Sequence, residues 1–213
     1  MQHAFGLDIP QTVEEACDPS RTALLVYDMQ VGVLSQIEDA AGLVTRVGRV
    51  LDAARAAGVR VLFVRHTTLP PELTGVKGLR MAMAWQRLAD VKDVRSVFPP
   101  GSPQYQLTPE LEPGPAEVVF DKVTMSALEG TPVDLVLRDC GVTTIVVVGV
   151  ATEIGIDPTV RHAADLGYIP VIVTDACAAG DPEAGERALA NLAFLGDMLF
   201  TDTGTLEGIL GGE

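Results

Sequence analysis

The sequence predicts an α/β fold whose core is a mainly parallel β-sheet with helices on both faces. The first observation comes from residues 143–156, where the first six residues are all β-branched and the run is apolar on both faces. Strands that helices bury on both sides have this composition. The second observation is that predicted strands and helices alternate along the chain, which favours right-handed crossovers between parallel strands. The third is the strand-to-helix turn after Gly149, because open α/β sheets bind ligands at such turns.

The individual elements follow from apolar runs, helical periodicity and turn residues. Apolar, β-branched runs predict strands at residues 22–27, 59–64, 116–120, 143–150, 168–174 and 198–201. Helical spacing and capping residues predict helices at residues 43–57, about 78–89, 131–140, about 156–167 and 182–195. Pro132, Pro158 and Pro182 suit the first turns of three of these helices, where no amide donor is required.

Two segments show no such pattern. Residues 1–21 are predicted to form an irregular arm. Residues 66–115 hold eight of the fourteen prolines, and a connection this long inside a compact domain is usually functional. We therefore expect residues 66–115 to be a long active-site segment. With 213 residues and 47% hydrophobic content, the sequence predicts one domain over residues 1–213.

Composition narrows the classes of partner. The formal net charge of −14 argues against nucleic acid and against anionic membranes. No apolar run approaches membrane-spanning length, and the N-terminus lacks a basic region followed by an apolar one. Cys17, Cys140 and Cys177 are too few and too scattered for a disulfide framework or a zinc site. We expect a cytoplasmic protein that acts on a small molecule.

An acidic and a basic residue follow two of the predicted strands. Asp28 comes directly after residues 22–27, and Lys122 comes shortly after residues 116–120. Because the carboxyl ends of parallel strands share one edge of the sheet, we expect Asp28 and Lys122 within hydrogen-bond or ion-pair distance. Such a pair would tune both pKa values. The alternative is that Asp28 caps a neighbouring helix and that Lys122 is solvated.

The sequence lacks the motifs of common cofactor and metal sites. The turn after the first strand reads DMQVG, whereas a dinucleotide fold would have G-x-G-x-x-G there. Gly149 and Gly155 are not followed by the lysine of a phosphate loop. His3, His66 and His162 are isolated from one another along the chain. We expect neither a cofactor nor a metal.

Three stretches, LLVYDMQ, VVFDKVTMSALEGT and VVVGVATEIGIDPTVRHAADLGYIPVIVTDAC, resemble the isochorismatase-like hydrolase family in that order. The resemblance covers about residues 20–202. It implies a Rossmann-like three-layer sandwich with a six-stranded sheet of order 3-2-1-4-5-6. It also implies a cis peptide bond between Val150 and Ala151, and a homodimer or higher homo-oligomer. The apolar run 206–210 and the apolar helix near residues 79–91 give some support to self-association.

One departure from the family pattern determines the expected chemistry. The resemblance implies that most family members are amidases with an Asp–Lys–Cys triad, and Gly155 stands at the position of that cysteine. Isochorismatases proper resemble this chain in having glycine there, and they cleave a vinyl ether without a nucleophilic side chain. The resemblance thus implies that Asp28 is the general acid, that Lys122 is its partner, and that Gly155 leaves room for the substrate. Cys177, at the end of the next predicted strand, is not expected to replace the missing nucleophile.

The substrate is expected to be small and anionic and to contact both the sheet edge and the long segment. The expected contact residues are Gln30, Arg80, Trp85, Arg87, Val150, Ala151, Thr152 and Glu153, with Lys77 as a further cation. Isochorismatases resemble this chain less at Glu153, where they have histidine. An alternative is therefore an amide or ester hydrolase in which Glu153 or Asp28 activates water. Ser126 and Thr152 are not expected to act as nucleophiles, because no base for their hydroxyl groups is evident in the sequence. A third possibility is a catalytically silent binding protein, against which the retained Asp28 and Lys122 argue.

Overall fold

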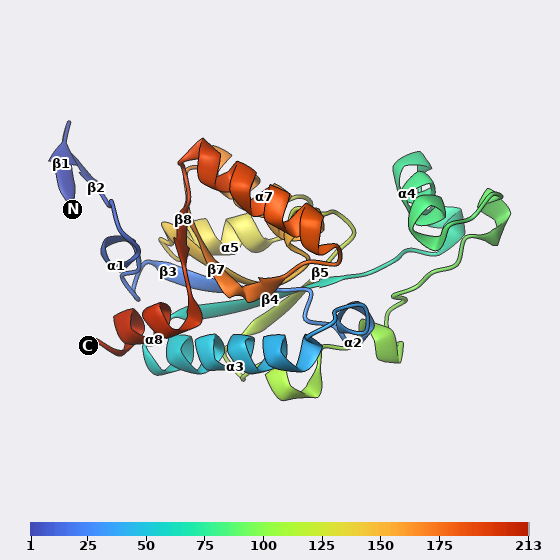
Figure 1. Cartoon of the computed structure of the whole chain (residues 1–213), viewed down its shortest axis with the longest axis horizontal. Coiled ribbons are helices and arrows are strands. Elements are labelled where there is room, and N and C mark those ends of the chain that lie inside the picture. Colours follow the sequence, from blue (N-terminus) through green and yellow to red (C-terminus); the bar gives the residue numbers. More distant parts are fainter. Residues whose placement is uncertain (213) are drawn as a thin grey trace.

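A six-stranded parallel β-sheet forms the centre of the molecule in the computed structural model, which describes residues 1–212 (Figure 1). Its strands are β3 (Thr22–Tyr27), β4 (Arg60–His66), β5 (Val118–Lys122), β6 (Thr144–Val150), β7 (Ile169–Ala178) and β8 (Leu199–Thr201). Their spatial order is β5-β4-β3-β6-β7-β8, and every neighbouring pair is parallel. Numbered by chain order within the sheet, this is 3-2-1-4-5-6. The fold class and the strand order are confirmed.

Helices cover both faces of the sheet because side chains alternate between the two faces along each strand. The long helix α3 (Ala40–Ala56) and the C-terminal helix α8 (Thr203–Gly211) lie against one face. The opposite face is covered by α5 (Val133–Asp139), α6 (Asp157–Asp165) and α7 (Pro182–Leu195). Figure 1 shows α3 and α8 below the sheet and α5 and α7 above it. The apolar faces of both helix layers thus bury the sheet on two sides, as the composition of residues 143–156 predicts.

The central strands β3 and β6 position the site. Every residue of these two strands is buried, and Tyr27 lies opposite Gly149 in their register. The chain leaves β3 and β6 toward opposite ends of the sheet order, so their carboxyl ends form the topological switch point. Asp28 and the turn after Gly149 therefore lie side by side.

Several local expectations are wrong. The arm of residues 1–21 is not irregular: β1 (Gln2–Ala4) and β2 (Leu7–Ile9) form a hairpin, and α1 (Val13–Ala16) follows. Its turn, Phe5-Gly6, has positive φ at both residues, as tight two-residue hairpin turns require. The short helix α2 (Val31–Leu34) and α8 are two further elements that sequence patterns do not reveal. Within the apolar run 206–210, Leu206 is fully buried by packing of α8 on α3, so this run is largely used inside the chain.

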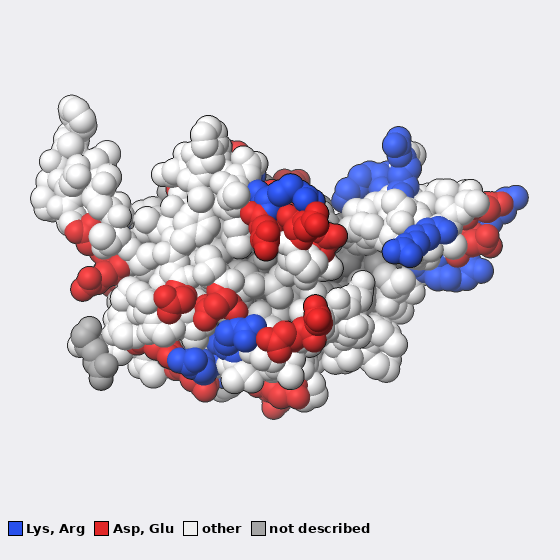
Figure 2. Space-filling model, viewed as in Figure 1, with Lys and Arg blue, Asp and Glu red and all other residues white. Residues whose placement is uncertain are grey.

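The long segment projects from the body (Figure 1). It contains the 3₁₀ turns η1 (Pro71–Leu73), η2 (Val91–Asp93), η3 (Pro103–Tyr105) and η4 (Pro109–Leu111), and the helix α4 (Val76–Gln86). α4 ends three residues before its predicted end because Arg87 adopts a left-handed conformation with φ of 54°. No residue of α4 is buried. Its cations stand out at the right of the otherwise strongly acidic molecule in Figure 2. None of the helices within residues 1–212 has the length and apolar composition that crossing a membrane would take.

Candidate active site

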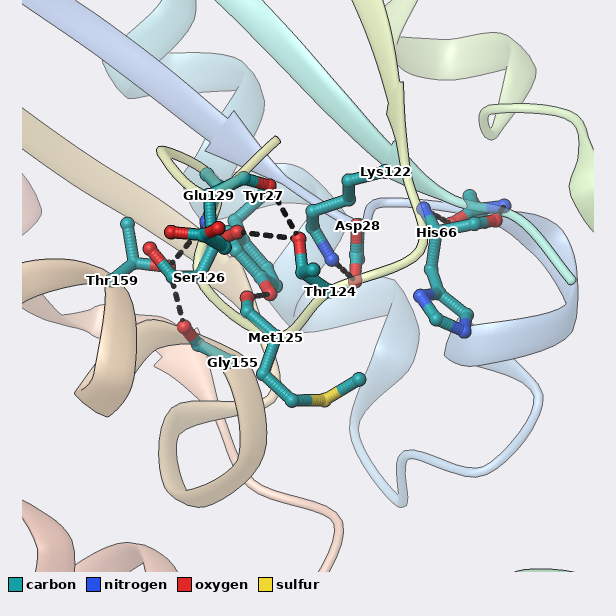
Figure 3. Close-up of polar contacts among 12 residues, drawn as sticks. Tyr27, Asp28, His66, Lys122, Thr124, Met125, Ser126, Glu129, Gly155 and Thr159 are labelled. Atoms are coloured by element: carbon teal, nitrogen blue, oxygen red, sulfur yellow. Dashed lines mark hydrogen bonds and ion pairs between the residues drawn. The ribbon is translucent and has the colours of Figure 1, made fainter. Parts of the chain in front are cut away.

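The predicted pair of Asp28 and Lys122 is present at the carboxyl edge of the sheet. The ammonium Nζ of Lys122 donates to Oδ2 of Asp28 over 2.8 Å, and both residues are buried (Figure 3). Asp28 follows β3 with a positive φ of 47°, whereas Lys122 is the last residue of β5 rather than a loop residue. The two strands flank β4, so the ion pair crosses above the end of β4.

Burial governs the protonation of this pair. Removal from water raises the pKa of Asp28 to about 6, although the charge and hydrogen bond of Lys122 oppose that rise. Burial also lowers the pKa of Lys122, against the opposing charge of Asp28. Oδ2 of Asp28 is occupied by Lys122, while Oδ1 is buried without a hydrogen-bond partner. Asp28 can therefore take up or release a proton near neutral pH through an oxygen that no protein group satisfies.

The turn after β6 forms the neighbouring wall of the site. The Val150–Ala151 peptide bond is cis, as the resemblance implies. A π-helix, η5 (Thr152–Ile156), then leads into α6, and the amides of Gly155 and Ile156 both donate to the carbonyl of Ala151 over 2.9 and 3.1 Å. Gly149 is required by close approach of β3, because a Cβ there would lie 2.0 Å from the carbonyl oxygen of Tyr27.

The space beside Gly155 is filled by Tyr27, which corrects the expectation that the substrate occupies it. A Cβ on Gly155 would lie 2.2 Å from the Tyr27 hydroxyl oxygen and 2.4 Å from two ring carbons. The Tyr27 hydroxyl donates to the carbonyl of Met125 (Figure 3), and Lys122 Nζ lies 4.2 Å from the ring centroid. Burial raises the pKa of Tyr27 well above 10, so the phenol stays neutral. The only sequence signal for this role is an aromatic residue directly before Asp28.

We expect Gly155→Ala to lower the free energy of unfolding by about 1–3 kcal/mol, because the added methyl group overlaps the buried Tyr27 ring. Urea unfolding measures this loss. Gly208→Ala in α8 is the matched control, since nothing lies within 4 Å of its Cβ position and its stability should not fall. Adding Tyr27→Leu to Gly155→Ala should recover part of the loss. Wild-type stability of Gly155→Ala would contradict this account of the site.

A cavity of about 630 Å³ opens above the Asp28–Lys122 pair. It lies between the carboxyl ends of the strands and the projecting segment, and its wall is largely apolar. Of the predicted contact residues, it is lined by Trp85, Val150 and Ala151, together with Lys77, Asp28 and Gly155. The remaining five predicted contact residues, Gln30, Arg80, Arg87, Thr152 and Glu153, do not line it.

Three of these five side chains, those of Gln30, Thr152 and Glu153, form hydrogen bonds with backbone groups. Gln30 is fully buried; its amide nitrogen donates to the carbonyls of His66 and Tyr105, and its oxygen accepts from the His66 amide. The hydroxyl of Thr152 donates to the carbonyl of Ala178. Gln30 and Thr152 therefore hold the ends of strands in place and are not exposed to a ligand.

Glu153 is turned toward the start of α7. One carboxylate oxygen accepts from the backbone amides of Gly180 and Asp181 over 2.9 and 3.1 Å. The carboxylate thus satisfies loop amides before α7 and does not reach the cavity. The second oxygen, Oε2, is buried without a hydrogen-bond partner, and the role of Glu153 as a base for water stays a prediction.

The two arginines of the predicted contact set lie on the outer side of the projecting segment. Lys77, Met81 and Trp85 recur every four residues along α4 and line the cavity. Arg80 falls between these positions, and Arg87 lies beyond the helix end; both are exposed. Lys77 and Arg80 are neighbours on the helix surface, but only Lys77 lines the cavity.

His66, predicted to be isolated, is part of the site. It is the last residue of β4 and lines the cavity (Figure 3), and only 6% of it is exposed. Burial lowers the pKa of His66 to about 3, so the imidazole is neutral. Its Nδ1 is buried without a partner. The missed signal is that His66 ends a strand next to the one that leads to Asp28.

Ser126 and the three cysteines lie outside the cavity. Ser126 does have a histidine partner, since its Oγ lies 2.9 Å from Nδ1 of His162, but neither residue lines the cavity. Burial raises the pKa values of Cys17 and Cys177 to about 12, and Cys140 is exposed on the surface. Within residues 1–212, no three acidic, histidine or cysteine side chains gather as a metal site would require.

Comparison with known proteins agrees with this architecture. The model of the isochorismatase domain family matches residues 22–203. The chain is 30% identical to a ureidoacrylate amidohydrolase, RutB, of Methylobacterium radiotolerans, over 97% of this chain and 86% of that protein. A cysteine hydrolase of Pseudomonas syringae pv. phaseolicola superposes with a TM-score of 0.76 at 25% identity, covering 92% of this chain and 95% of that one. An isochorismatase family protein of Desulfovibrio vulgaris gives a TM-score of 0.75 at 27% identity, with 90% and 98% covered. The chain therefore belongs to the isochorismatase family of hydrolases.

Proposed function

We propose that this chain hydrolyses a small anionic molecule without a covalent cysteine intermediate, with Asp28 as the residue that transfers the proton. The observation that carries the proposal is the buried carboxyl of Asp28, a residue that lines the cavity: its Oδ1 has no partner, while Lys122 binds Oδ2. The pKa of about 6 supports proton transfer near neutral pH. A nucleophilic thiol has no place beside this pair, because Tyr27 fills the space next to Gly155.

The reaction we propose is cleavage of a vinyl ether. Protonated Asp28 gives its proton to the terminal carbon of the C=C bond, whose π electrons form the new C–H bond. Water adds to the resulting oxocarbenium carbon, and its surplus proton returns to the Asp28 carboxylate. The hemiketal then collapses: its hydroxyl proton passes to the leaving oxygen, the C–O bond to that oxygen breaks, and a ketone and an alcohol are released. Lys122 orients the carboxyl throughout and balances its charge after the proton has left.

Amide hydrolysis is the second candidate, supported by the ureidoacrylate amidohydrolases among the relatives. Here ionised Asp28 accepts a proton from water, the water oxygen attacks the carbonyl carbon, and the departing nitrogen takes the proton back from Asp28. Glu153 is the other candidate base: one of its oxygens accepts from the amides of Gly180 and Asp181, and Oε2 is buried without a partner.

The test is product detection on a panel of isochorismate, ureidoacrylate, nicotinamide and simple amides. Turnover of isochorismate that disappears in Asp28→Asn supports vinyl ether cleavage, and Asp28-dependent ammonia release supports amide hydrolysis. A folded protein that turns over none of the panel would favour the silent binding protein. The homo-oligomer that the resemblance implies stays a prediction.

We expect activity to survive removal of every cysteine. Replacing Cys17 and Cys177 by alanine and Cys140 by serine should leave kcat/KM within a few-fold of wild type, since none of the three thiols lines the cavity. Iodoacetamide should likewise fail to inactivate the wild-type protein. Assays below the unfolding temperature separate activity from any stability loss at the buried Cys17. Complete loss of turnover in a folded Cys177→Ala variant would show that the nucleophile had moved by one strand.

A further inference from the structure

The first part of the projecting segment, residues 66–100, carries a net positive charge in an acidic protein, and Glu110 and Glu112 balance it over residues 66–115. Residues 66–100 contain five cations, Lys77, Arg80, Arg87, Lys92 and Arg95, against three acids, Glu72, Asp90 and Asp93. The whole chain has a net charge of −14. Figure 2 shows these cations gathered on the projecting part of the molecule. The entrance to the cavity is therefore the region that attracts an anion.

Lys77 brings one of these cations to the cavity. It lines the wall, and its positive charge contributes to lowering the pKa values of both His66 and Lys122. Among the salt bridges of residues 1–212, none includes Lys77. Asp28 is already bonded to Lys122, so it does not neutralise Lys77. Arg95 also lines the cavity, and none of these salt bridges includes it, so two cations of the wall, Lys77 and Arg95, are not balanced by Asp28.

The wall between Lys77 and Asp28 is apolar. Met81 and Trp85 face the cavity from α4, and Phe98, Met125 and Ile154 face it from the body and the loops. A volume of about 630 Å³ is within the range of sites that bind drug-sized molecules. A small polar acid alone would leave most of this apolar surface in contact with water.

Among the polar residues of this wall, His66 has a ring nitrogen without a partner. Nδ1 of His66 is buried and unpartnered, and the ring is neutral. A buried polar atom without a partner costs free energy, which a hydrogen bond from a ligand would recover. His66 lies at the same strand edge as Asp28, so this bond would form close to the reacting end of a ligand.

We propose that the cavity binds an amphipathic anion: a carboxylate at Lys77, an aromatic or alkyl body along Trp85 and Phe98, and a polar group at Nδ1 of His66. This proposal about the ligand depends on the proposed hydrolase function in one respect: it places the bond to be hydrolysed at Asp28 and Lys122. It identifies the substrate class as arylalkyl or acyl acids larger than simple dicarboxylates.

Trp85 is the only tryptophan of the chain, so its fluorescence reports binding without turnover. The probes are 4-phenylbutyrate, its neutral amide 4-phenylbutyramide, and 6-phenylhexanoate. We expect the acid to bind about five- to tenfold more tightly than the amide. The longer acid should bind about fifteenfold more tightly than 4-phenylbutyrate, since it has two more methylenes and each buried methylene contributes about fourfold.

Lys77→Met should weaken the preference for the acid over the amide, because Arg95 is then the only cation left in the cavity wall described by the structure. Lys92→Met is the matched control, because Lys92 is a cation of the same segment that does not line the cavity. Calorimetry on Trp85→Phe checks that the fluorescence change and the binding refer to one site. Equal binding of acid and amide by wild type, no effect of chain length, or an intact preference in folded Lys77→Met would each overturn the proposal. Binding without turnover of any hydrolase substrate would count against the proposed function alone.

Discussion

Asp28→Asn is expected to lower kcat/KM by about 10²- to 10⁴-fold, the usual contribution of general acid–base catalysis. Asparagine keeps the shape of the side chain but can neither give nor take the proton. Steady-state kinetics on whichever panel substrate wild type hydrolyses measures the loss. Asp139→Asn is the control and should retain wild-type activity, because Asp139 is an exposed residue at the end of α5. A folded Asp28→Asn variant within tenfold of wild type would remove Asp28 from the chemistry.

The pH profile of kcat/KM then distinguishes the two reactions, since it reports the ionisation of the free enzyme. With the pKa of Asp28 at about 6, a general acid is active below pH 6 and loses about tenfold per pH unit above it. A general base behaves in the opposite way, with activity falling as the pH drops below about 6. A falling limb above pH 6 supports vinyl ether cleavage, and a rising limb through pH 6 supports amide hydrolysis. In Asp28→Asn this limb should vanish.

Lys122→Met is expected to lower the free energy of unfolding at pH 8 by about 3–5 kcal/mol, the usual cost of removing one partner from a buried ion pair. Methionine fills much the same space, so the loss reports the Asp28 carboxylate that remains buried without its partner. Without Lys122, nothing opposes the effect of burial, and the pKa of Asp28 should rise further above its unfolded value of 3.8.

This rise determines how the loss depends on pH. A group with a raised folded pKa binds more protons in the folded state, so stability falls as the pH rises from about 4 through the folded pKa. The destabilisation by Lys122→Met should therefore be large at pH 8 and small at pH 5, as urea unfolding at both values would show. Adding Asp28→Asn should restore much of the stability at pH 8. An equal loss at both pH values would mean that Lys122 acts through packing and not through the charge of Asp28.

Sequence patterns alone determined the sheet and the position of its reactive edge. Buried strands are apolar over five to seven residues, so β3, β4 and β6 could be located within one or two residues of their bounds. Once the strands are parallel, their carboxyl ends must meet at one edge, which brings Asp28 and Lys122 together although 94 residues separate them. This inference needs only local periodicity and the geometry of crossovers.

The tertiary structure decided which side chains face the cavity, because orientation depends on partners far along the chain. Gln30 forms hydrogen bonds with backbone groups of His66 and Tyr105, and one oxygen of Glu153 accepts from loop amides after β7; neither residue lines the cavity. No local pattern shows that a backbone group dozens of residues away lacks a partner. The closure of the space beside Gly155 likewise depends on Tyr27 of the adjacent strand. The sequence thus predicts where the chemistry lies, whereas the packing between strands decides which groups are free to carry it out.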